Sequence, residues 1–197
     1  MWLARGTRNA LQTSAGLTAP ADAEARAYAL AAFDLLSTEP LNRLSMWDSN
    51  GTRSVLIQGA QFKIEAGTGL ASKEATVFSL SALRQLANEP TNRQAMWQDE
   101  AGARSALVAA AHLARFAASP PPGLPPMDEQ AATTAMRRQR HHTDTLDRDA
   151  QDFGLEGLRN LARSPANRRA MWEDTQGARA ALVGAANLRG LNRRKAR

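Results

Sequence analysis

The chain of 197 residues has no cysteine, few aromatic residues and no long apolar run. The absence of cysteine excludes disulfide bonds, thiolate metal ligands and cysteine nucleophiles, and makes a reducing compartment the default. Aromatic residues make up only 5% of the chain, and alanine and leucine supply most of the apolar content, which favours an all-α fold over a β-sandwich. Because no stretch of about 18 apolar residues occurs, we expect no membrane span and a protein inside the cell, in the cytoplasm rather than the nucleus.

Lysine is also scarce, since only Lys63, Lys73 and Lys195 occur, and the formal charge of +6 comes almost wholly from arginine. Arginine is suited to bidentate recognition of carboxylate or phosphate, which would suit a nucleic-acid partner. A genome rich in G and C would also enrich arginine and alanine without any functional reason. We favour this second, compositional explanation.

A repeated motif organises the chain. Four Met-Trp pairs occur, at Met1-Trp2, Met46-Trp47, Met96-Trp97 and Met171-Trp172. Each pair is followed by a glycine and, two residues later, an arginine, and a leucine comes three residues after that arginine: Gly6, Arg8 and Leu11; Gly51, Arg53 and Leu56; Gly102, Arg104 and Leu107; Gly177, Arg179 and Leu182. Recurrence of all four tryptophans in one register indicates an internal repeat.

The sequence before the last three pairs shows the same register. A proline lies six residues before each methionine, at Pro40, Pro90 and Pro165, and an Asn-Arg pair follows it. Apolar residues precede each proline at steps of three and four and predict one buried helix face in each repeat: Tyr28, Leu30, Phe33 and Leu36; Phe78, Leu80, Leu83 and Leu86; Phe153, Leu155, Leu158 and Leu161. Proline ends one helix and fits the first turn of the next, so residues 40–47, 90–97 and 165–172 should be short helices. A longer helix, such as 103–117, should follow each glycine.

The spacing between successive Met-Trp pairs is 45, 50 and then 75 residues, so the last interval contains an insertion. We place it at residues 119–143, as an exposed, flexible loop that is rich in proline at its start and basic at its end, with a short helix around residues 129–140. Residues 189–197 form a basic C-terminal tail. The domain organisation is therefore one repeat domain over residues 1–197, with this loop and tail.

Three stretches of the chain resemble the armadillo repeat. The best copy runs through Leu158-Arg159-Asn160-Leu161-Ala162, Asn167-Arg168, Met171, Gly177-Ala178-Arg179 and Leu182-Val183. A second runs from Leu83-Arg84-Gln85-Leu86-Ala87 to Leu107-Val108, and a poorer one from Leu30 to Leu56. The resemblance implies a right-handed α-solenoid of about three to four three-helix repeats, the first of them incomplete. In this family the third helices line a concave groove that commonly holds an extended peptide.

The resemblance also implies which residues would contact that peptide. An asparagine late in the third helix bonds the peptide backbone in many family members; Asn160 matches it, Gln85 is chemically similar, and Leu35 departs from the pattern. The tryptophan expected one turn earlier is replaced by Ala31, Ser81 and Glu156, which disfavours a nuclear-import receptor.

The recurring polar and aromatic residues have structural explanations. A residue that occurs once per repeat usually packs between neighbouring units, so we expect Trp47, Trp97 and Trp172 in the core. The arginine after each glycine either stacks on the tryptophan or caps a helix end. We expect Asn42, Asn92 and Asn167 to bond backbone groups at the corners.

No motif for catalysis, metal or cofactor binding is present. His141-His142 are adjacent, so they do not share a helix face, and arginines flank them. We therefore expect a non-catalytic scaffold that binds a segment of another protein, through the concave residues Asp34, Arg84, Gln85, Arg159 and Asn160.

The alternative is phosphate contact with nucleic acid through the basic residues Arg137, Arg138, Arg140, Arg193, Arg194, Lys195 and Arg197.

The first repeat lacks its long helix before Met1-Trp2. This predicts that Leu11 and Leu17 are partly uncovered, and that the chain either self-associates or belongs to a longer parent array.

Overall fold

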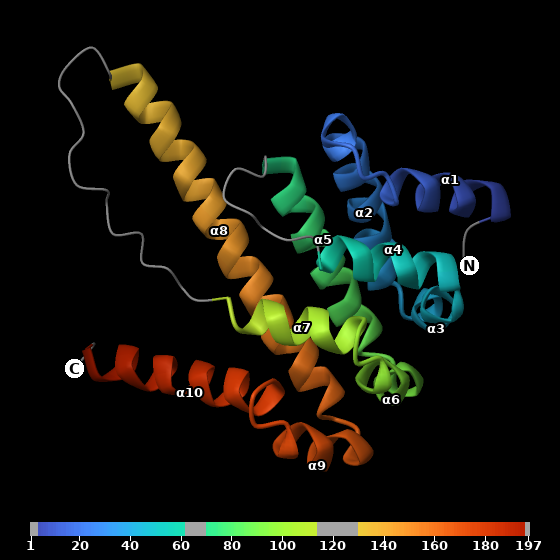
Figure 1. Cartoon of the computed structure of the whole chain (residues 1–197), viewed down its shortest axis with the longest axis vertical. Helices are drawn as coiled ribbons and strands as arrows, with labels where there is room; N and C mark the ends of the chain where they lie inside the picture. Colours follow the sequence, from blue (N-terminus) through green and yellow to red (C-terminus); the bar gives the residue numbers. More distant parts are fainter. Residues whose placement is uncertain (1–3, 62–69, 114–129, 196–197) are drawn as a thin grey trace.

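The computed structural model describes residues 4–61, 70–113 and 130–195, with side chains except those of 130–141, 143 and 187–195. These residues form α-helices and one short 3₁₀ helix, and no strand occurs among them (Figure 1). The fold is therefore all-α, as predicted. The helices are α1 (Arg5–Ala15), η1 (Pro20–Asp22), α2 (Ala23–Thr38), α3 (Pro40–Asp48), α4 (Asn50–Ala60), α5 (Leu70–Leu86), α6 (Pro90–Gln98), α7 (Ala103–Ala111), α8 (Gln130–Leu161), α9 (Pro165–Glu173) and α10 (Ala178–Lys195).

The helices after α1 fall into three related units, and each unit consists of a long helix, a short helix and a final helix. Unit 1 is α2–α4, unit 2 is α5–α7 and unit 3 is α8–α10. The short helices α3, α6 and α9 each begin at the proline of the motif, which confirms the prediction made for residues 40–47, 90–97 and 165–172. Proline fits this first position because its missing N–H would have no partner there.

The apolar faces predicted from the repeat form the core. Leu83, Leu86, Leu107, Leu158 and Leu161 are fully buried, as expected, whereas Leu182 is only half-buried. Leu11 and Leu17 are half-buried, in agreement with the partial cover predicted for them. Met1 and Trp2 lie outside the described residues.

The units stack side by side through equivalent helices, with α5 packed between α2 and α8 (Figure 1). The motif asparagines hold this arrangement together. Each donates its side-chain amide to the last carbonyls of its own long helix: Asn42 to Leu36 O at 3.0 Å, Asn92 to Leu86 O at 3.1 Å and Asn167 to Leu161 O at 3.1 Å. The bonds to backbone at the corners are thus confirmed. Asn92 also donates to Arg43 O at 3.1 Å, and Asn167 to Arg93 O at 2.9 Å, so these two asparagines join their units to the preceding ones.

Two glycines let α8 pack closely on α7. A Cβ at Gly154 would lie 2.6 Å from the backbone N of Ala111, and one at Gly157 would lie 2.6 Å from Leu107 Cδ2. Contacts this short do not occur for real side chains, so the helix pair depends on the missing Cβ atoms.

The insertion and the tail are more helical than predicted. The short helix predicted around residues 129–140 is helical, but residues 130–143 belong to α8, which continues without a break into the core. The prediction of a loop up to residue 143 is therefore wrong for residues 130–143, and residues 114–129 are not among those described. Helix α10 extends to Lys195, where we expected a tail from residue 189. Helix α7 ends at Ala111 and not at residue 117.

Two aromatic residues predicted in the core are exposed. Trp172 is 61% exposed and Tyr28 is 74% exposed, whereas Trp47 and Trp97 are buried as expected. The exposed residues lie in the last and first units, where no further unit packs on them. Phe78 and Phe153, the equivalents of Tyr28, pack against the core.

Candidate binding surface

The five residues that we expected on a concave face lie on α2, α5 and α8, the long helices that stack along the molecule. Asp34, Arg84 and Arg159 occupy one equivalent position in units 1, 2 and 3. Leu35, Gln85 and Asn160 occupy the next. The structure therefore brings Asp34, Arg84, Gln85, Arg159 and Asn160 onto one row of helices, as the repeat predicts.

Arg84 is the centre of the junction between α5 and α8. Its guanidinium donates to Glu156 Oε2 at 2.6 Å and lies 4.6 Å from the ring centroid of Phe153, and both of these residues are on α8. It also donates to Ser81 Oγ at 3.4 Å, and its buried Nε has no hydrogen-bond partner among the described residues. Arg84 thus serves as a contact between units as well as a candidate ligand contact.

The two amides of the row are also engaged within the protein. Asn160 donates from Nδ2 to Arg84 O at 3.3 Å, and Gln85 Oε1 accepts from Asn88 Nδ2 at 3.2 Å. Both side chains are half-buried and retain further hydrogen-bonding capacity. Arg159 is exposed, so its guanidinium is the most accessible cation of the row.

Asp34 lies at the junction between α2 and α5. Burial raises the pKa of its carboxyl group, while a hydrogen bond with Ser81 and the charge of Arg84 act in the opposite direction and do not overcome this effect. Its Oδ1 is buried without a partner among the described residues. The row therefore carries a partly desolvated carboxylate at one end and an exposed arginine at the other.

Residues that we did not single out as contacts complete the row. Glu156, Phe153 and Ser81 all contact Arg84, and Lys73 of α5 pairs with Asp147 of α8 at 2.9 Å. Phe153 was placed in the core from its spacing. The acidic residues of α8 carried no consistent repeated signal, because Ala31 and Ser81 stand at the positions equivalent to Glu156, and Asp22 and Ser72 at those equivalent to Asp147.

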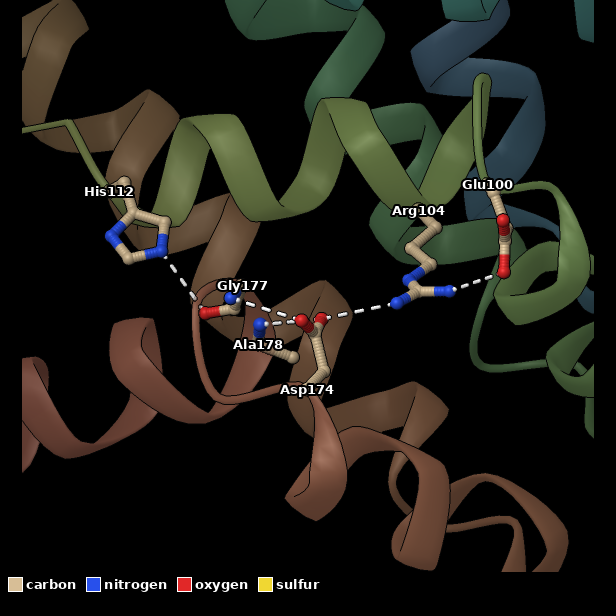
Figure 2. A network of polar contacts seen from close by, with 6 residues as sticks. All are labelled: Glu100, Arg104, His112, Asp174, Gly177 and Ala178. Atoms are coloured by element: carbon tan, nitrogen blue, oxygen red, sulfur yellow. Dashed lines mark hydrogen bonds and ion pairs between the residues drawn. The ribbon is translucent and has the colours of Figure 1, made fainter.

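A second set of polar contacts joins α1 to unit 1, and joins each of units 1 and 2 to the unit that follows it. Gln12 of α1 donates to Thr52 Oγ1 at 2.9 Å, and Gln61, just after α4, donates to Ala101 O at 2.6 Å. His112, just after α7, contacts Gly177 O through Nε2 at 3.1 Å (Figure 2). The residues just after α4 and α7 therefore reach the corner of the following unit.

Asp174 ties units 2 and 3 together at this corner. It accepts from the backbone N–H groups of Gly177 and Ala178 at the start of α10, and Arg104 of α7 approaches its carboxylate at 3.3 Å (Figure 2). Burial raises the pKa of Asp174, but the hydrogen bonds from Ala178, Arg104 and Gly177 and the charge of Arg104 outweigh it, so the net pKa is lowered. A side chain that both caps a helix and pairs across a junction stabilises the stacking of the units.

The repeated arginines stack on the repeated tryptophans, which confirms one of the two roles expected for them. The guanidinium carbon lies 5.3 Å from the ring centroid in Arg53–Trp47, 4.2 Å in Arg104–Trp97 and 4.3 Å in Arg179–Trp172. These distances fall within the range of cation–π contacts. The pairs are part of the architecture of each unit.

The alternative basic residues fall where side chains are not described. Arg137, Arg138 and Arg140 lie on the first half of α8, and Arg193, Arg194 and Lys195 at the end of α10; Arg197 is outside the described residues. Within the described part of the chain, no group of three or more His, Cys, Asp or Glu side chains could hold a metal ion. None of the described helices is both long and apolar enough to span a membrane.

Fold and surface together define an all-helical molecule built from three stacked, related units. Comparison with models of known protein families, with curated proteins and with solved structures finds no match to this chain.

Proposed function

We propose that this protein is an armadillo-like α-solenoid, with right-handed stacking of its units, and that it works as a non-catalytic scaffold. It binds an extended segment of a partner protein along the row formed by α2, α5 and α8. The observation that carries this proposal is the alignment of Arg84, Gln85, Arg159 and Asn160 at equivalent positions of two stacked helices. Side-chain amides and guanidinium groups repeated along a row suit the repeated carbonyl groups of an extended chain.

The charges of the row favour a segment with acidic residues. Arg159 is exposed and suited to bind a carboxylate in bidentate geometry, whereas Arg84 is already paired with Glu156. At the unit 1 end, Asp34 and the exposed Leu35 offer no cation, so that end suits neutral or apolar residues. We therefore expect the acidic part of the partner segment at unit 3.

Fluorescence anisotropy with labelled, unstructured peptides tests this proposal. One peptide carries spaced glutamates in a Gly-Ser background, and the other carries glutamines at the same positions. We expect the acidic peptide to bind more tightly, and Arg159→Ala to weaken its binding by roughly tenfold or more, as loss of a charged hydrogen bond does.

Arg169→Ala is the matched control, because Arg169 is an exposed arginine of the same unit that lies on α9 and pairs with Glu173. An equal loss of peptide binding in both variants would show a general charge effect, and no binding of either peptide would contradict the proposal. A salt titration with single-stranded and double-stranded nucleic acid covers the alternative. Tight, steeply salt-dependent binding that is insensitive to Arg159→Ala would favour the nucleic-acid function.

A further inference from the structure

The outer side of unit 3 shows the surface that units 1 and 2 bury at their junctions. Trp47 and Trp97 are 4% and 5% exposed, but Trp172 is 61% exposed, although all three carry a stacked arginine. Ile57 and Val108 are half-buried, and their equivalent Val183 is exposed. We call this outer side of unit 3, with Arg159 and Trp172, the C face.

The outer side of unit 1 shows the opposite half of the same junction. Tyr28 is 74% exposed, whereas its equivalents Phe78 and Phe153 pack against the core where a preceding unit covers them. Leu35 is 71% exposed, whereas its equivalents Gln85 and Asn160 are half-buried. We call this outer side of unit 1, with Tyr28 and Leu35, the N face.

We propose that the C face of one copy of this chain binds the N face of a second copy. The junctions within the chain show which residues would meet. Arg84 of unit 2 stacks on Phe153 of unit 3 at 4.6 Å, and their equivalents on the two free faces are Arg159 and Tyr28. An exposed guanidinium and an exposed aromatic ring are thus presented at matching positions.

The short helices repeat this complementarity. Asn92 donates to Arg43 O and Asn167 donates to Arg93 O across the two internal junctions. At the ends of the array the equivalent acceptor is Arg168 O on α9, and the equivalent donor is Asn42 on α3, which is 4% exposed and donates to Leu36 O. The second copy would also cover Trp172, whose equivalents Trp47 and Trp97 are buried in the two units that are followed by another.

Helix α1 limits the extent of this contact. It packs on α2 and α4, as α4 packs on α5 and α7, so it already occupies the place that α10 of another copy would take. A second copy therefore cannot repeat the full geometry of the internal junctions, because its α10 would overlap α1. The contact that remains joins α8 and α9 of one copy to α2 and α3 of the next, with α10 turned aside from α1. Such a reduced interface should be weak and dependent on concentration, and because its two sides differ it allows chains of more than two copies.

Sedimentation velocity over a range of concentrations tests the proposal. We expect the unmodified full chain to form dimers and larger species as its concentration rises. Trp172→Ala on the C face and Tyr28→Ala on the N face should each weaken this self-association by roughly tenfold or more, as loss of a central aromatic contact does. Both residues are exposed, so circular dichroism should show both variants folded.

Mixing the two variants gives the decisive result. The Trp172→Ala copy retains an intact N face and the Tyr28→Ala copy an intact C face, so the mixture should form a dimer that neither variant forms alone, and should stop at the dimer. Leu44→Ala is the control for loss of an exposed apolar side chain, because its equivalent Gln94 stays exposed between two neighbours and lies outside the junctions. It should self-associate like the unmodified chain.

Other outcomes would overturn the proposal. A monomer at every concentration would do so. Association lost in Trp172→Ala but unchanged in Tyr28→Ala would indicate a symmetric contact between two C faces, and equal weakening by Leu44→Ala would indicate nonspecific apolar association. None of these results depends on whether the row of α2, α5 and α8 binds a peptide.

Discussion

Units 2 and 3 share a sequence motif but place it in different surroundings. Trp97 and Trp172 each follow a methionine on a short helix, and each has an arginine stacked at nearly the same distance, 4.2 Å and 4.3 Å. Trp97 is 5% exposed because unit 3 follows it, while Trp172 is 61% exposed. The comparison shows that the motif determines local contacts, whereas the neighbouring unit determines burial.

The corners of the two units also share a local contact and differ in the contact that they make with the preceding unit. Asp99 and Asp174 both accept from a backbone N–H at the start of the next helix, at 3.0 Å from Ala103 N and Ala178 N. Arg104 of the preceding unit reaches Asp174, but its equivalent Arg53 donates to Asn50 within its own unit at 2.6 Å. The helix cap is common to both units, and the ion pair across the junction is not.

The largest difference should appear on truncation of the two tryptophans. Trp97→Ala should cost about 3 to 5 kcal/mol of unfolding free energy, because it removes a buried ring and leaves a cavity. Trp172→Ala should cost less than about 1 kcal/mol, since the ring is largely exposed. Urea denaturation of dilute protein measures both losses of unfolding free energy. Similar losses in the two variants would mean that the different burial of Trp97 and Trp172 does not change their contribution to stability.

A smaller difference is expected between two helical glycines of unit 3. Gly154→Ala should destabilise by about 1 to 3 kcal/mol, because the new Cβ would press on the backbone N of Ala111. Gly184→Ala meets no atom within 4 Å and should stabilise α10 by about 0.5 to 1 kcal/mol. Thermal unfolding of both variants checks the opposite signs, and stabilisation by Gly154→Ala would contradict the close packing of α8 on α7.

The smallest effect concerns the two corner aspartates. Asp174→Asn keeps a capping oxygen but loses the charge paired with Arg104, and should cost less than about 1 kcal/mol at pH 7. The lowered pKa of Asp174 means that the folded state favours the ionised form. Its contribution is complete above the ordinary aspartate pKa of about 3.9 and is lost as the pH falls through the lower folded value.

The difference between the unmodified chain and Asp174→Asn should therefore disappear in acid. Asp99→Asn is the matched control at the corner without the inter-unit pair, and should cost less at pH 7. Urea midpoints measured from pH 2 to 7 test the prediction, and a difference that persists at the lowest pH would exclude the ionised pair as its cause.

Part of the candidate surface could be predicted from sequence, because its residues recur in register. The repeat placed Asp34, Arg84, Gln85, Arg159 and Asn160 on equivalent helices. The repeat could not reveal that Arg84 pairs with Glu156 or that Asn160 bonds Arg84 O, because these partners lie 72 and 76 residues apart. The short helix predicted around residues 129–140 was not expected to join the long helix of unit 3, since the basic run beside a proline-rich stretch was taken for part of a loop.

The sequence by itself determined the short helices, their starts at Pro40, Pro90 and Pro165, and the asparagine bonds at the corners, because each depends on chemistry within a few residues. Only the tertiary structure decided which copies of a repeated residue are buried. Trp172 and Tyr28 carry the same local signals as their buried or packed equivalents, and they differ because burial requires a neighbouring unit on that side.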